Sequence, residues 1–179
     1  MRVIAGKYKG RKLESPKSNA IRPTTDKVKE AVFGSLQFDI PGAVVLDAFA
    51  GSGSLGIEAL SRGAEHVDFV EKNSVCLRTL KSNLNMIGAD NCSIIRGDVI
   101  KSVDRLRKYD IVFLDPPYDD GFYIPFLEMA TEHKMVNEGG KIVLECRRKF
   151  DFALPKEYNL IKKKDYGDIS LWFLGYAEV

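Results

Sequence analysis

The stretch VVLDAFAGSGSLGIEAL, residues 44–60, decides the fold class of this chain. It begins as a β-branched apolar run, passes through Gly51, Gly53 and Gly56, and continues into a helix-forming segment. A G-x-G-x-x-G loop between a strand and a helix brings the backbone close to a ligand, because glycine has no Cβ. The glycine spacing alone is weak evidence, so the surrounding sequence must show what the loop serves.

Strand and helix patterns alternate outward from this stretch. The strand candidates are residues 43–49, 66–71, 92–97, 110–115 and 141–146. One helix follows Gly53 and ends near Gly63, and a second starts after Ser74 and ends at Gly88. This alternation predicts an α/β, doubly wound, Rossmann-like domain whose mostly parallel sheet is covered by helices.

Two further segments flank the alternating region. Residues 158–176 hold two strand-like runs that are too close together for a crossover helix, so they predict an antiparallel C-terminal hairpin, with Trp172 in the core, and a seven-stranded sheet. Residues 2–14 predict a small basic hairpin, and Thr24 or Thr25 can cap the helix that follows. We therefore expect a basic N-terminal extension over residues 1–24 and one domain over residues 25–179.

The composition excludes several classes of protein. The three cysteines, Cys76, Cys92 and Cys146, are odd in number and outside any C-x-x-C spacing, which argues against a disulfide framework or a zinc site. His66 and His133 are isolated and show no metal-ligand spacing. No apolar stretch has the length of a signal sequence or a membrane span. We expect a cytoplasmic protein with no metal and no membrane contact.

The net charge of +2 hides an asymmetry. Residues 1–30 carry nine Lys and Arg against three Asp and Glu, or +6, which leaves eighteen against twenty-two, or −4, in the remainder. A solvated arm and a surface that grips a polyanion are both compatible with this pattern.

Four acids close four successive strands of the expected sheet: Asp47, Glu71, Asp98 and Asp115. Ligands of such sheets bind outside the carboxyl ends of the strands, so these acids are expected in one crevice. Glu71 stands twenty residues after Gly51, where a carboxylate can accept both hydroxyls of a ribose, and Asp98 can accept from an adenine amino group. The alternatives are that Asp47 only binds the loop amides and that Asp98 only caps the following helix.

The segment DIVFLDPPYDDG, residues 110–121, runs a strand into an acid, two prolines and an aromatic ring. Proline lacks an N–H and fixes φ, so Pro116 and Pro117 end the strand and hold the Asp115 carboxylate and Pro116 carbonyl in place. The result is a stiff polar ledge beside the Tyr118 ring. The alternative is a strand that ends in a proline turn with a surface tyrosine.

These motifs carry a family resemblance. In their order, LDAFAGSGSLGIEALSRGA, VEKN, RGDV and LDPPY resemble class I S-adenosylmethionine-dependent methyltransferases. RPTTDKVKEAVF and RVIAGKYKGRKL narrow the resemblance to the RsmD family of bacterial 16S ribosomal RNA (guanine-N2) methyltransferases, over nearly the whole chain. Lys27 and Lys29 stand where arginines are common in that family, so the bidentate phosphate contact of an arginine is not available there.

The resemblance implies methyl transfer from S-adenosylmethionine to the exocyclic N2 of a specific guanine in 16S ribosomal RNA, within an assembled or assembling small subunit. It also implies a cytoplasmic enzyme, which we expect to be a monomer. The implied cofactor-binding residues are Asp47, Phe49, Ala50, Gly51, Gly53, Glu71, Lys72, Asp98, Val99 and Asp115. The implied catalytic residues are Asp115, Pro116, Pro117 and Tyr118. The expected RNA-binding residues are Lys7, Lys9, Arg11, Lys12, Arg22 and Thr24.

The DPPY segment suits a reaction at a planar amine. Hydrogen bonds from the amine N–H groups to the Asp115 carboxylate and the Pro116 carbonyl would favour a pyramidal, reactive nitrogen, while Tyr118 would stack on the base. Because the same ledge suits any planar nitrogen, a methyltransferase for adenine in nucleic acid or for glutamine in protein is the nearest alternative. A binding protein that no longer transfers methyl and a dinucleotide dehydrogenase are weaker alternatives, and the dehydrogenase leaves Asp98 and the ledge unexplained.

Overall fold

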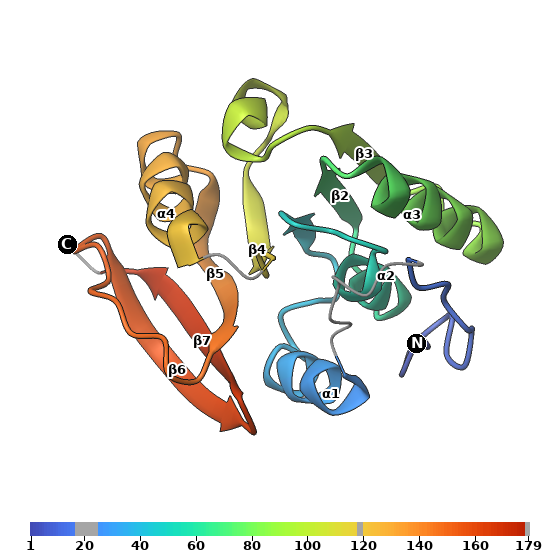
Figure 1. Ribbon diagram of the computed structural model, residues 1–179, viewed down its shortest axis with the longest axis horizontal. Helices are drawn as coiled ribbons and strands as arrows, with labels where there is room; N and C mark the ends of the chain where they lie inside the picture. The colour runs from blue at the N-terminus through green and yellow to red at the C-terminus, as the bar shows by residue number, and fades with distance from the viewer. Residues whose placement is uncertain (17–24, 118–119, 178–179) are drawn as a thin grey trace.

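The computed structural model describes residues 1–16, 25–117 and 120–177 of the chain. Within these residues one mixed sheet has the strand order β3-β2-β1-β4-β5-β7-β6 (Figure 1). Its strands are β1 (Val44–Asp47), β2 (His66–Glu71), β3 (Cys92–Arg96), β4 (Tyr109–Leu114), β5 (Val136–Arg147), β6 (Tyr158–Tyr166) and β7 (Ile169–Tyr176). The helices are α1 (Asp26–Ser35), α2 (Ser54–Ser61), α3 (Ser74–Ile87) and α4 (Tyr123–Glu132), with short 3-10 helices η1 (Ile100–Arg105) and η2 (Asp120–Phe122).

The predicted fold class is confirmed. Strands β1 to β5 are parallel where they pair, whereas β7 runs antiparallel to both β5 and β6, as expected for a C-terminal hairpin. Trp172 is buried as predicted. Strand β5 begins five residues before the predicted residue 141, because Val136 already pairs with Tyr109 of β4 before an irregularity in the register.

Alternate residues of the central strands face two separate layers of core. Val45 of β1 and Ile111 of β4 pack with α1, α2 and α3 on one face, whereas Leu46 and Val112 pack with α4 and η1 on the other. Both sets are buried, which is why these strands read as continuous apolar runs and not as alternating ones. No helix in the described part of the chain has the length and apolar character needed to cross a membrane.

The helix ends follow local sequence signals. Thr25 accepts a hydrogen bond from the Val28 N–H at 3.3 Å and caps α1, whereas Thr24, the other candidate cap, lies outside the described residues. Asn73 caps α3, and Gly88 ends it in the left-handed region with φ 65°. A Cβ on Gly56 would lie 2.2 Å from the Phe69 ring, so a glycine is needed there for α2 to approach β2.

The predicted basic N-terminal hairpin is present over residues 1–14 and is packed against the domain. Arg2 and Lys12 form an antiparallel bridge, while Val3, Tyr8 and Leu13 are buried in the same core layer as α1, α2 and α3. The boundary that we predicted at residue 24 falls outside the described residues, so the division into extension and domain stays a prediction.

The N-terminal hairpin lies along α2. Its turn meets the end of α2, where the Lys7 N–H donates to the Ser61 carbonyl at 2.7 Å. Its other end reaches the cavity described below, which Met1 helps to line together with Ser54 at the start of α2. The backbone of the turn at Lys7 is therefore separated from the cavity by the length of α2, about 12 Å for 8 residues.

Candidate active site

A cavity of about 310 Å³ opens at the carboxyl ends of the parallel strands. It brings together most of the residues that the sequence predicted as a site. From that set the lining residues are Asp47, Phe49, Ala50, Gly51, Glu71, Lys72, Asp98, Val99, Asp115, Pro116 and Pro117. The expectation that the acids closing four strands meet in one crevice is therefore met by the geometry.

Asp47 is the buried acid of this cavity, with 2% of its surface exposed. Its Oδ2 accepts a hydrogen bond from the Gly56 N–H at 2.9 Å, across the glycine loop. Burial raises the pKa of Asp47 to about 7, and the nearby charges of Asp115 and Glu71 add to the rise while the Gly56 N–H opposes it. Asp47 thus binds an amide of the glycine loop, which was the alternative role considered for it from the sequence, and it also lines the cavity.

Glu71 is held by two backbone donors. The Gly51 N–H donates to its Oε2 at 2.8 Å and the Asn73 N–H to its Oε1 at 2.7 Å, which fixes the carboxylate at the cavity wall. Each carboxylate oxygen keeps a further lone pair for a ligand hydroxyl. A Cβ on Gly51 would meet no atom within 4 Å, so the loop beside Glu71 leaves open space.

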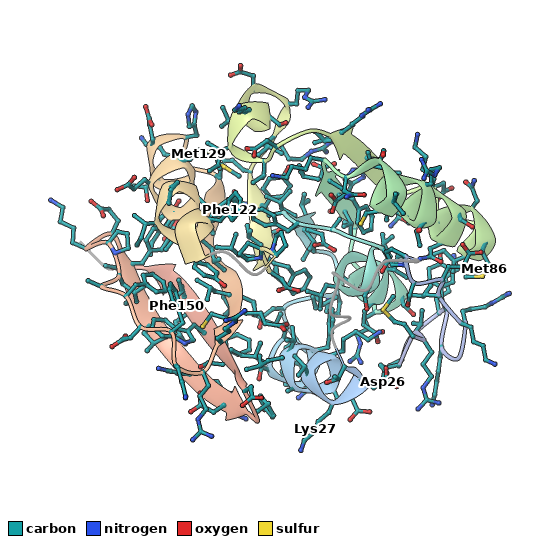
Figure 2. The ribbon with its side chains drawn as sticks, viewed as in Figure 1. Asp26, Lys27, Met86, Phe122, Met129 and Phe150 are labelled. Carbon is teal, nitrogen blue, oxygen red and sulfur yellow. The ribbon has the colours of Figure 1, made fainter. Side chains whose placement is uncertain are left out.

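Asp98 and Phe49 border the adjoining part of the cavity. Asp98 Oδ1 accepts the N–H groups of Ile100 and Lys101 at 3.0 and 3.3 Å, so this acid caps η1 while also lining the cavity. The Phe49 ring contacts the Phe122 ring with centroids 5.3 Å apart, and the Lys72 ammonium lies 5.4 Å from the same ring. Phe122 is labelled in Figure 2. Phe49, which lines the cavity, is thus supported from behind by a ring of a second chain segment.

Asp115, Pro116 and Pro117 follow β4 and line the same cavity. Asp115 is half-buried and Pro116 is buried, so the ledge predicted from the sequence stands at the wall. Tyr118 lies outside the described residues, as do Arg22 and Thr24 of the predicted RNA-binding set.

Gly53 serves the turn into α2, and its predicted part in the cofactor site stays a prediction. Among the described residues that line the cavity, Gly53 does not appear. It is the N-cap of α2 with φ 88°, and a Cβ there would lie 2.5 Å from Leu80. The glycine is needed because the loop turns in the left-handed region while packed against α3.

Several lining residues were not predicted. They are Met1, Ala48, Ser52, Ser54, Leu55, Val70, Asn73, Cys76, Gly97, Tyr123, Glu145, Cys146, Arg147 and Ile169. The rule that strand ends line the crevice, applied above to four strands, would have found Glu145 to Arg147 at the end of β5 as well. Tyr123 begins α4 and donates from its hydroxyl to the Glu145 carbonyl at 2.9 Å, which no sequence pattern indicated.

Two charged residues outside the cavity make contacts that the sequence did not indicate. His66 is half-buried and lies 3.0 Å from Asp68 Oδ1 and 3.2 Å from Ser93 Oγ. Lys29 is fully buried and lies 3.3 Å from Glu58 Oε2, away from the surface on which RNA phosphates could be met. Lys7, Lys9, Arg11 and Lys12 are exposed, as a surface that meets RNA requires.

Comparison with known proteins agrees with this geometry. Residues 1–175 match the family model described as Conserved hypothetical protein 95. A Haemophilus influenzae protein named Ribosomal RNA small subunit methyltransferase D is 36% identical over 178 residues, covering 95% of this chain and 91% of the relative. The Escherichia coli protein of the same name is 31% identical over 172 residues, covering 95% and 87%.

Solved structures show the same architecture. The structure named "Putative methyltransferase yhhF from Escherichia coli" superposes with a TM-score of 0.89 at 30% identity, covering 98% of this chain and 97% of that one. The strand order with an antiparallel last pair is that of the class I methyltransferase fold. Because the family model spans residues 1–175 and both relatives exceed 30% identity over 95% of this chain, the chain belongs to the RsmD family.

Proposed function

We propose that this protein transfers a methyl group from S-adenosylmethionine to the exocyclic N2 of a guanine in 16S ribosomal RNA of the small ribosomal subunit, in the bacterial cytoplasm. One observation carries the proposal: the Asp115-Pro116-Pro117 ledge lines the same cavity as Glu71 and Asp98, which are suited to a nucleoside. The names of the relatives as small subunit ribosomal RNA methyltransferases support the substrate class.

The residues of the cavity fit S-adenosylmethionine. Glu71, held by two N–H donors, can accept from the ribose hydroxyls, and Asp98 can accept from the adenine amino group. Ser54 Oγ is buried in the cavity wall and has no hydrogen-bond partner among the described residues, so a polar group of a ligand can satisfy it. The apolar wall at Phe49 and Val99 suits the faces of an adenine ring.

When bound, S-adenosylmethionine supplies an activated methyl group on a sulfonium that leaves as a neutral thioether. The chain then has to orient the acceptor and stabilise charge, which needs no protein nucleophile. The Asp115 carboxylate and the Pro116 carbonyl accept hydrogen bonds from the amine, and both contacts strengthen as positive charge develops on the nitrogen. Asp115 takes the proton that the methylated amine releases. The stacking role of Tyr118 is proposed from the sequence alone.

The test is methyl transfer to small subunits purified from a strain that lacks this protein. Transfer of labelled methyl, followed by mass spectrometry of the nucleosides, should yield N2-methylguanosine. Duplex DNA and total protein serve as parallel acceptors for the adenine and glutamine alternatives. If the label appears only in adenine or in protein, the proposed substrate is wrong.

Asp115→Asn tests the role of the ledge within the same assay. We expect turnover to fall by about a hundred-fold or more, the usual scale for losing a charged group that acts in the transition state. Affinity for S-adenosylhomocysteine should change by only a few-fold. Near-normal turnover of Asp115→Asn would remove Asp115 from the mechanism.

A further inference from the structure

We propose that residues 147–152, which we name the basic strap, bind RNA phosphates beside the nucleotide that enters the cavity. The inference rests on the proposed function, because it assigns a second RNA contact to the same site. The strap contains Arg147, Arg148 and Lys149, all exposed, followed by Phe150 and Phe152. None of these residues belongs to the basic N-terminal region from which the sequence predicted RNA binding.

The strap begins at the site itself. Arg147 is the last residue of β5 and lines the cavity together with Glu145 and Cys146. Strand β5 pairs in parallel with β4, and Asp115 follows β4 directly. The strap therefore leaves the sheet at the carboxyl ends of the strands, on the same side as the ledge. A nucleotide held at the ledge would have its neighbouring phosphates at this rim.

The aromatic residues of the strap attach it to the domain. The Phe150 ring lies 5.0 Å from the Tyr123 ring at the start of α4, and the Phe152 ring stacks 5.1 Å from Trp172 of β7. Figure 2 labels Phe150 in this region between α4 and the β6–β7 hairpin. These contacts fix the strap against α4, which follows the DPPY segment closely in the chain.

Backbone hydrogen bonds fix it further. The Arg148 N–H donates to the Asp168 carbonyl at 2.7 Å and the Phe150 N–H donates to the Arg147 carbonyl at 2.8 Å. The cations are therefore presented on an ordered turn, which lowers the entropy lost when they bind a partner.

Two of the three cations have no acidic partner among the described residues. Other cations form short ion pairs, such as Arg107 with Asp68 at 2.9 Å and Lys141 with Asp39 at 2.7 Å. Arg148 pairs with Asp165 at 3.3 Å. Among the described residues, no carboxylate lies within 4.0 Å of the charged groups of Arg147 or Lys149.

Exposed cations that have no acidic partner in the described part of the chain, and that lie at the rim of a site, can bind an anionic ligand. A guanidinium such as that of Arg147 can hold a phosphate with two parallel hydrogen bonds, and the Lys149 ammonium adds a point charge. Because the partner of the proposed reaction is RNA, the chemistry that these cations would recognise is its phosphate backbone.

The test compares two variants of equal charge. Arg147→Gln/Lys149→Gln removes the two uncompensated cations of the strap. Lys108→Gln/Lys156→Gln is the matched control. Both lysines are exposed and lie just before β4 and β6, at the ends of these strands that are opposite to the cavity. Binding to small subunits is measured over a salt series with S-adenosylhomocysteine present, so the readout does not depend on turnover.

We expect the strap variant to lose about 1.4 from the slope of log affinity against log salt, at about 0.7 per contact. At about 0.1 M salt the same two contacts correspond to roughly 25-fold in affinity. Calorimetry with S-adenosylhomocysteine checks that both variants keep a folded cofactor site. The control variant should keep the wild-type slope.

A strap variant with the wild-type slope and affinity overturns the inference, and so does an equal loss in the control, because net charge would then explain it. The proposed function fails separately. If the wild-type protein binds small subunits but produces no N2-methylguanosine, the reaction is wrong, while the salt slopes still decide whether the strap contacts RNA.

Discussion

Among single residues, Asp47 links the stability of the fold to pH. Its pKa in the folded protein, about 7, lies above its ordinary value of 3.8, because burial disfavours the carboxylate. A group with a raised folded pKa contributes stability that is fully present below about pH 4 and is lost as the pH rises through about 7. Asp47 therefore weakens the ligand-free protein as the pH approaches neutrality.

Asp47→Asn should remove this dependence while its amide oxygen still accepts the Gly56 N–H. Relative to the wild type, the free energy of unfolding of the variant should rise by roughly 2.5 kcal/mol between about pH 5 and about pH 8. Urea unfolding of both proteins at the two pH values measures this difference, and other titrating groups cancel in the comparison. A constant difference between the proteins across this range would mean that Asp47 is ionised normally.

Glu71 is the residue on which cofactor affinity should depend. Glu71→Ala removes the acceptor for two ribose hydroxyls and leaves the Gly51 and Asn73 N–H groups without their partner. We expect affinity for S-adenosylmethionine to fall by about ten- to a hundred-fold, or roughly 1.5–3 kcal/mol. Calorimetry measures the change, with Glu132→Ala, an exposed acid at the end of α4, as the control. Equal affinities for the two variants would exclude the ribose role.

Among the elements, the N-terminal hairpin depends on a buried acid of α2. Glu58 accepts the Ile4 and Ala5 N–H groups at 2.9 and 3.0 Å, and it pairs with Lys29 of α1 at 3.3 Å. The Lys29 ammonium also donates to the Arg2 carbonyl at 2.6 Å. Burial lowers the pKa of Lys29, although the charge of Glu58 opposes this. Two helices and the hairpin thus meet at one ion pair.

Lys29→Met should destabilise the protein by about 3 kcal/mol, because it leaves the Glu58 charge buried without this partner. Lys29→Met/Glu58→Gln should cost less than the sum of the two single changes, since the two side chains act as a pair. Urea unfolding of the four proteins gives the coupling energy. If the costs of the two single changes simply add up in the double variant, Lys29 is not coupled to Glu58. Arg62, 2.9 Å from Glu58, would then neutralise the acid without Lys29.

The sequence predicted the elements better than it predicted these polar contacts. Strand ends, glycine caps and the terminal hairpins are local signals, so the cavity wall from Asp47 to Asp115 could be anticipated. The burial of Lys29 could not, because lysine is usually solvated and its partner lies 29 residues away on another helix. The contribution of β5 to the site was not predicted, because the candidate strand 141–146 ends in a cysteine whereas an acid closes each of the other four.

At the scale of the whole molecule, the basic side chains proposed to bind RNA lie in two segments, the N-terminal hairpin and the strap. The N-terminal hairpin lies beside α2 and α3, whereas the β6–β7 hairpin, against which the strap packs, lies at the opposite end of the sheet (Figure 1). Met1 of the N-terminal hairpin and Arg147 of the strap both line the cavity. An RNA strand that places a nucleotide in the cavity can therefore contact both.

The hairpin has its own test. Replacing Lys7, Lys9 and Arg11 with alanine should leave S-adenosylmethionine binding intact, since the cofactor contacts proposed here lie at residue 47 and beyond, while methyl transfer to RNA collapses at physiological salt. If three to five of the proposed phosphate contacts form, they account for a slope of about −2 to −4 in log affinity against log salt. The proposed contacts are Lys7, Lys9, Arg11, Lys12 and Arg22. Titration of both ligands into the triple variant measures the two effects.

The position of Lys7 and Lys9 sharpens this expectation. They lie near the end of α2 that is far from the cavity, so only an RNA that extends about 12 Å or more beyond the bound nucleotide can reach them. A short oligonucleotide should therefore bind the triple variant almost as well as the wild type, whereas small subunits should not. Wild-type affinity and slope with small subunits would instead make the hairpin a solvated surface, and the strap would then have to supply the grip on RNA.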